Sequence, residues 1–98
     1  MTIDAFRASL AAAAPPDDLS RPLQALWHAG RGEWDAAHGI AQSDDTAEAA
    51  WVHAHLHRLE GDLANARYWY RRAGRPECTA DTSEEWAEIA AALHDGQG

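Results

Sequence analysis

The chain has no lysine, a single cysteine and no long apolar run. With Cys78 alone, no internal disulfide can form. Without an apolar stretch of about 20 residues, no membrane-spanning helix is predicted. The N-terminus also lacks the basic segment and apolar stretch of a signal peptide. These absences favour a cytoplasmic protein that has no membrane partner.

The charge is strongly acidic but unevenly distributed. Eight arginines face 16 acidic residues, for a formal net charge of −8. Such a charge argues against a general nucleic-acid binder. Most of the arginines nevertheless fall between Arg58 and Arg75, so the chain has one basic region. If charge drives recognition, this region predicts an acidic protein or peptide partner.

Apolar residues recur at helical spacing in six segments, and no segment has the alternation of a strand. We therefore predict a single all-α domain, residues 1–98, of about six helices. Its first helix should span residues 2–14, because the residue before Pro15 is disfavoured in a helix. A last helix over residues 81–94 is predicted by Thr82 and Glu85, which have capping-box spacing.

An internal repeat occupies the centre of the chain. Gly32 and Gly61 lie 29 residues apart, and the residues around them match: His28 aligns with His57 and Ala37 with Ala66. A repeat of this length is typical of stacked helix pairs. We therefore expect two helical hairpins, residues 18–46 and 47–75, flanked by an N-terminal and a C-terminal capping helix.

The segment Gly61-Asp-Leu-Ala-Asn-Ala66, followed by Tyr70 and Ala73, resembles tetratricopeptide (TPR) and Sel1-like repeats. The earlier segment Gly32-Glu-Trp-Asp-Ala-Ala37 is a weaker copy. The 29-residue period is shorter than is usual in those families. Residues 68–76 also look like a segment of small uncharacterised bacterial proteins. This likeness implies nothing about activity. The repeat resemblance implies a TPR-like module that binds a protein or peptide, or itself.

Three residues match the concave surface that this resemblance implies. In TPR-like proteins the first helix of each repeat lines that surface, and Trp51, His55 and Arg58 correspond to it. An exposed Trp beside an Arg resembles an interface hot spot. The alternative is that a terminal helix covers Trp51.

The basic region adds three further candidates for partner binding. Arg67, Arg71 and Arg72 are interleaved with aromatic residues, and guanidinium groups beside aromatic rings suit carboxylates or phosphates. The alternative is that these arginines are solvated or pair with carboxylates of the chain.

The histidines support a different function, metal or small-ligand binding. His53 and His57 lie one helical turn apart and could chelate a metal, with His28 adding a third ligand from the neighbouring hairpin. No cysteine lies nearby, however, and no His-Glu-x-x-His motif is present. A packed imidazole at a repeat-core position explains His28 and His57 better. We therefore predict no cofactor and no stabilisation by zinc.

No catalytic constellation is visible. The paired acidic residues lie at expected helix starts, where negative charge complements the helix dipole. No phosphate-binding glycine loop or nucleophile elbow is present. The sequence predicts a binding module and not an enzyme.

Overall fold

The computed structural model describes residues 2–97, with side chains through residue 95, so Met1 and Gly98 of the predicted domain lie outside it. Within this range the chain forms six α-helices, one 3₁₀ turn and no strand. In chain order the elements are α1 (Ile3–Ala8), η1 (Ser9–Ala11), α2 (Arg21–Gly30), α3 (Trp34–Gln42), α4 (Ala47–Leu59), α5 (Leu63–Ala73) and α6 (Thr82–Gln97). The prediction of an all-α fold with about six helices is confirmed.

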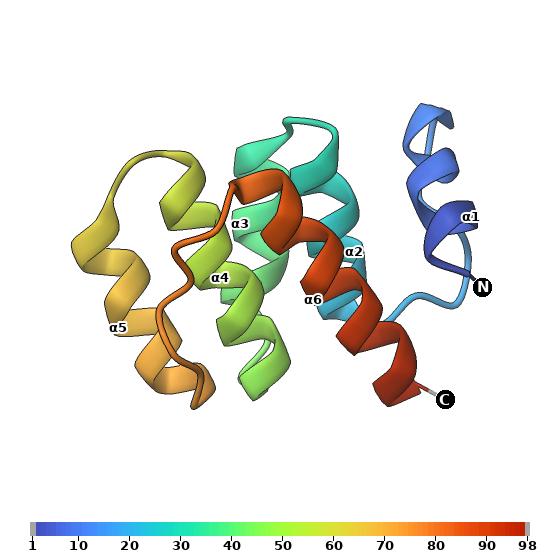
Figure 1. Ribbon diagram of the computed structural model, residues 1–98. Helices are drawn as coiled ribbons and strands as arrows, with labels where there is room; N and C mark the ends of the chain where they lie inside the picture. The colour runs from blue at the N-terminus through green and yellow to red at the C-terminus, as the bar shows by residue number, and fades with distance from the viewer. Residues whose placement is uncertain (1, 98) are drawn as a thin grey trace.

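The two copies of the internal repeat fold as the hairpins α2–α3 and α4–α5 (Figure 1). Each turn places its glycine in the left-handed region, with φ of +76° at Gly32 and +83° at Gly61. A residue with a Cβ would be strained there. In each turn the residue after the glycine donates its backbone N–H to the carbonyl of the repeat histidine, His28 or His57, at 2.9 Å. The two turns therefore have the same backbone hydrogen bond at equivalent positions.

The alanines that follow these turns are also equivalent. Ala37 of α3 and Ala66 of α5 are both fully buried. A methyl side chain at these positions lets the two helices of a hairpin approach closely, and a larger one would overpack the contact. The match between the two halves of the sequence is thus reproduced in their packing.

Both terminal helices differ in length from the prediction. The first α-helix ends at Ala8 instead of residue 14, because the Ser9 hydroxyl donates to the Phe6 carbonyl at 2.5 Å and the chain tightens into the 3₁₀ turn. Such local bonds compete with the regular helix ladder. The last helix begins at Thr82 and continues to Gln97, beyond the predicted end at His94.

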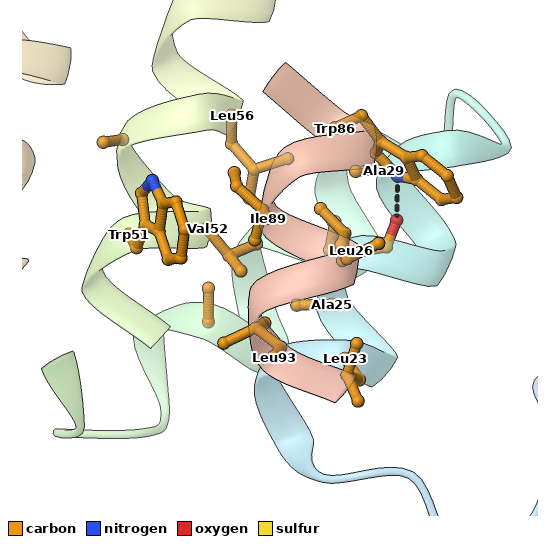
Figure 2. Packing of buried hydrophobic residues seen from close by; sticks show 14 of the residues in the cluster. Leu23, Ala25, Leu26, Ala29, Trp51, Val52, Leu56, Trp86, Ile89 and Leu93 are labelled. Carbon is orange, nitrogen blue, oxygen red and sulfur yellow. Dashed lines mark hydrogen bonds between the residues drawn. The ribbon is translucent and has the colours of Figure 1, made fainter. Parts of the chain in front are cut away.

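Helix α6 completes the core by packing across α2 and α4 (Figure 1). Figure 2 shows Ile89 and Leu93 of α6 among the apolar side chains of these two helices. The indole of Trp86 donates to the Leu26 carbonyl at 2.8 Å, which fixes α6 on α2. Phe6 of α1 stacks on the same indole, with ring centroids 5.4 Å apart. Burial of one such large side chain contributes about 1.5–3 kcal/mol, so the terminal helices cap the two hairpins effectively.

None of the helices in the described part of the chain combines the length and the apolar character needed to cross a bilayer.

Candidate functional site

Trp51, the expected exposed anchor of a partner surface, lies inside the protein. Only 4% of this residue is exposed (Figure 2). The guanidinium of Arg75, just beyond α5, lies 3.7 Å from the centroid of the indole ring. Gly74 adopts the left-handed conformation that ends α5 immediately before Arg75. The expectation of an exposed Trp51 is therefore wrong, because a cation–π contact with Arg75 covers the ring.

His55 and Arg58 also have partners inside the protein. The Nδ1 atom of His55 lies 2.7 Å from Oε1 of Glu85, and Nη1 of Arg58 donates to the same oxygen at 2.9 Å. The Tyr70 hydroxyl donates to the other carboxylate oxygen. Arg58 donates through its second terminal nitrogen to the Ala80 carbonyl at 2.5 Å. These four side chains, here called the Glu85 network, join α4, α5 and α6.

The Glu85 network is buried and electrostatically satisfied. His55 and Glu85 are each 1% exposed. Burial alone would raise the pKa of the Glu85 carboxyl, but hydrogen bonds from His55, Tyr70 and Arg58 lower it below 4.5. Burial and the hydrogen bond to Glu85 raise the pKa of Tyr70. His55 and Arg58 are therefore unsuited to an exposed concave surface, because α6 covers them and supplies their partner.

The arginines of α5 remain at the surface. Arg67 lies 3.2 Å from a carboxylate oxygen of Glu77, and both residues are exposed. Arg72 donates to the Tyr68 hydroxyl at 3.2 Å, and its guanidinium lies 5.2 Å from the ring centroid of Trp69. Arg71 is exposed and has no hydrogen bond or ion pair with any described side chain. Arg71 and Arg72 thus form no ion pair with a carboxylate of the described residues, although the Tyr68 hydroxyl and, to a lesser degree, the charge of Asp45 raise the pKa of Arg72.

His28 does not join the histidines of α4. Its Nδ1 atom lies 2.8 Å from Glu33 in the turn of the first hairpin, and its ring meets the edge of Trp27. The metal site of His28, His53 and His57, considered only as an alternative from the sequence, is therefore not assembled in this fold.

A different histidine completes a group of three. His38 projects from α3 toward His53 and His57, which lie one turn apart on α4. One ring nitrogen from each residue lies within 4.8 Å of the other two. The Nε2 atoms of His38 and His53 are 3.0 Å apart, and the Nδ1 atom of His57 lies 2.6 Å from Oε1 of Glu60. We call His38, His53 and His57 the histidine cluster.

Two tryptophans form the walls of the histidine cluster. Trp69 of α5 stacks on His53 with ring centroids 3.7 Å apart and an interplanar angle of 13°. Trp34 stacks on His38 with centroids 4.7 Å apart and an angle of 11°. The Trp34 indole also donates to the Leu56 carbonyl at 2.7 Å, which holds α3 against α4. These ring contacts limit how far the imidazoles can rotate.

The environment of His38 and His53 favours the neutral imidazole. Burial lowers the pKa of His53 to about 4, and the nearby His38 and His57 contribute in the same direction. Burial and the proximity of His57 also lower the pKa of His38. His53 is almost completely buried, and its Nδ1 atom has no hydrogen-bond partner among the described atoms. Near neutral pH His38 and His53 are therefore uncharged, the form of imidazole that binds metal ions.

The sequence does contain a feature that points to His38, its four-residue spacing from Trp34, but the apolar helical pattern does not include it. His38 lies four residues after Trp34, so the two share a face of α3. His53 and His57 have the same spacing on α4. Pairing the two i, i+4 motifs requires knowledge of how α3 crosses α4, and the hairpin repeat does not supply it. The repeat instead aligned His28 with His57. These two histidines each contact a glutamate in the turn of their own hairpin, Glu33 and Glu60, and not each other.

Comparison with protein-family models, curated proteins and solved structures gives no match to this chain.

Proposed function

We propose that this protein is a binding module for an acidic protein or peptide, and that it binds through the exposed face of α5. The observation that carries the proposal is the state of Arg71. It is exposed and has no partner among the described side chains, although the chain has twice as many acidic residues as basic ones. Arg72 beside it contacts aromatic rings instead of a carboxylate.

The chemistry of this face suits carboxylate groups. Tyr68, Arg71 and Arg72 occupy neighbouring positions on α5, and Tyr68 is 43% exposed. A guanidinium can bind a carboxylate through two parallel hydrogen bonds, and tyrosine and arginine are enriched among residues that dominate binding energy. Arg67 extends the face but already pairs with Glu77, so a partner must compete for it. This surface replaces the one predicted around Trp51, His55 and Arg58.

The resemblance of the repeats to TPR and Sel1-like proteins supports a binding role over an enzymatic one. A cytoplasmic location agrees with the single cysteine and with the resemblance to small bacterial proteins. The same face could bind an acidic region of a second copy of the chain, in which case the partner is the protein itself.

The test uses defined probes. Fluorescently labelled peptides of glutamate, glutamine and arginine, equal in length, would be titrated with the protein and followed by anisotropy. We expect the glutamate peptide alone to bind, and to bind more weakly as salt rises, because exposed charges are screened beyond about 8 Å at physiological ionic strength. Sedimentation of the free protein over a concentration series would detect self-association.

A matched pair of variants locates the interaction. Arg71→Gln should weaken binding of the glutamate peptide and lower its salt dependence. Arg21→Gln removes the same charge from α2, where Arg21 donates to Ser43, and should leave binding unchanged. Equal losses in the two variants would show only general charge attraction. No binding even at low salt, together with a monomer at all concentrations, would contradict the proposal.

A further inference from the structure

The geometry of the histidine cluster points to a metal site: we propose that His38, His53 and His57 bind one divalent transition-metal ion, with zinc as the reference case. The site lies between α3 and α4 and shares no residue with the acidic-partner surface of α5. It revises the expectation from the sequence that the histidines serve only for packing, because that expectation considered His28 in place of His38.

The spacing of the ring nitrogens suits a single ion. Zinc binds imidazole nitrogen at about 2.0–2.1 Å, so two nitrogens of a tetrahedral site lie roughly 3.3–3.4 Å apart. The Nε2 atoms of His38 and His53 are already 3.0 Å apart, and a nitrogen of His57 lies within 4.8 Å of both. An ion that enters the cluster would replace the hydrogen bond between His38 and His53. Small rotations of the rings would then bring three nitrogens to bonding distance.

Glu60 supplies the support that a metal-binding histidine commonly has. A ligating imidazole usually donates its other N–H to a carboxylate, which fixes the ring orientation and the tautomer. The Nδ1 atom of His57 lies 2.6 Å from the Glu60 carboxylate, and this contact leaves Nε2 available for the ion. The same carboxylate adds a negative charge near the site.

The cluster is incompletely satisfied without a ligand. His38 and His53 share one hydrogen bond, and the Nδ1 atom of His53 is buried without a partner among the described atoms. An ion bound at the two Nε2 atoms would replace this shared hydrogen bond, whereas the Nδ1 atom of His53 would stay without a partner and does not itself argue for the ion. Stacking on Trp34 and Trp69 nevertheless holds the rings of His38 and His53 in place. Such preorganisation reduces the entropy lost when a ligand binds.

Three histidines leave a fourth position on a tetrahedral ion. Among the three ligands His38 is the most exposed, since it is half-buried whereas His53 and His57 are buried. A water molecule can therefore reach the ion from the side of His38. The coordination set is three imidazole nitrogens and one water.

Untagged protein would be freed of metal with a chelator and titrated with zinc chloride in a calorimeter. We expect one equivalent to bind, and the melting temperature to rise as free zinc exceeds the dissociation constant. Cobalt chloride is the second probe, because tetrahedral Co²⁺ gives a visible absorption spectrum. Trp34 and Trp69 should report binding through a change in fluorescence, since both stack on ligands.

Histidine-to-glutamine variants separate this site from the other histidines. His38→Gln should weaken zinc binding by about ten-fold or more, and Glu60→Gln should weaken it to a lesser extent. His28→Gln is the matched control and should bind as the unmodified protein does. Circular dichroism in chelator would establish that each variant is folded. The proposal is overturned if folded protein binds no zinc, or if His38→Gln binds as tightly as His28→Gln.

Discussion

Helix α4 carries two polar clusters on different faces, and their contrast separates structural groups from candidate ligands. His55 belongs to the Glu85 network, in which one carboxylate accepts from an imidazole, a guanidinium and a phenol. Two residues along, His57 belongs to the histidine cluster, in which no described carboxylate lies between the imidazoles. The first cluster balances a buried negative charge. The second brings three imidazoles together, and the Nδ1 atom of His53 is buried without a partner among the described atoms.

This contrast shows that burial alone does not distinguish a packed histidine from a functional one. His53 and His55 are both almost fully buried. What differs is the number and kind of partners that each ring nitrogen has. His55 is paired with a charged carboxylate, whereas the Nε2 atom of His53 contacts another imidazole, a contact that a metal ion can replace.

The largest expected effect is the removal of Glu85. Glu85→Ala would leave the guanidinium of Arg58 and the imidazole of His55 without their shared carboxylate. Breaking a buried charge pair on one side typically costs about 3–5 kcal/mol. Urea denaturation followed by circular dichroism should show a loss of that size. A loss below about 1 kcal/mol would mean that the network contributes little to the fold.

A matched pair of substitutions on α4 compares the two clusters directly. His55→Phe removes a donor from the buried Glu85 carboxylate and should cost about 1–3 kcal/mol. His53→Phe keeps the stacking on Trp69 and deletes the nitrogen that lacks a partner, but it also removes the hydrogen bond with the half-buried His38. Stability should therefore fall by less than in His55→Phe. Thermal unfolding of both variants in the presence of chelator would measure the difference. Equal destabilisation would show that His53 is as structural as His55.

The smallest expected effect is on the free energy of unfolding at acidic pH. Because the folded-state pKa of Glu85 lies below the ordinary value of 4.5, its carboxylate stabilises the fold above that pH. This contribution is lost as pH falls through the lowered folded-state pKa. The difference in unfolding free energy between the protein and Glu85→Gln should therefore shrink below pH 4.5. Denaturation curves at several acidic pH values would test this, and a constant difference would contradict it.

The helical architecture could be predicted from the sequence because it depends on local patterns. The match around Gly32 and Gly61 predicted two hairpins with equivalent turns, and Ala37 and Ala66 are buried as that match requires. The last helix begins at Thr82, one residue after the predicted start, but the Glu85 carboxylate bonds to other helices and forms no capping box. These features need only nearest neighbours in the chain, which a periodic pattern can encode.

The sites were less accessible because they depend on contacts between distant helices. Glu85 reaches His55 across 30 residues. The sequence left open that a terminal helix covers Trp51, but it did not indicate that Arg75 lies over the ring. His38 meets His53 only through the crossing of α3 and α4. A search for i, i+4 pairs of histidine and tryptophan would have flagged both faces, but their pairing requires the three-dimensional arrangement.

The most direct measurement is a set of long-range ¹H–¹⁵N spectra of the histidine side chains, recorded before and after one equivalent of zinc. Each ring nitrogen is observed separately, so the two clusters are compared in a single sample. The account predicts that nitrogens of His38, His53 and His57 change their chemical shifts on binding, while those of His55 stay as they were. Unchanged spectra for the three residues, or changes at His55 or His28 in their place, would contradict it.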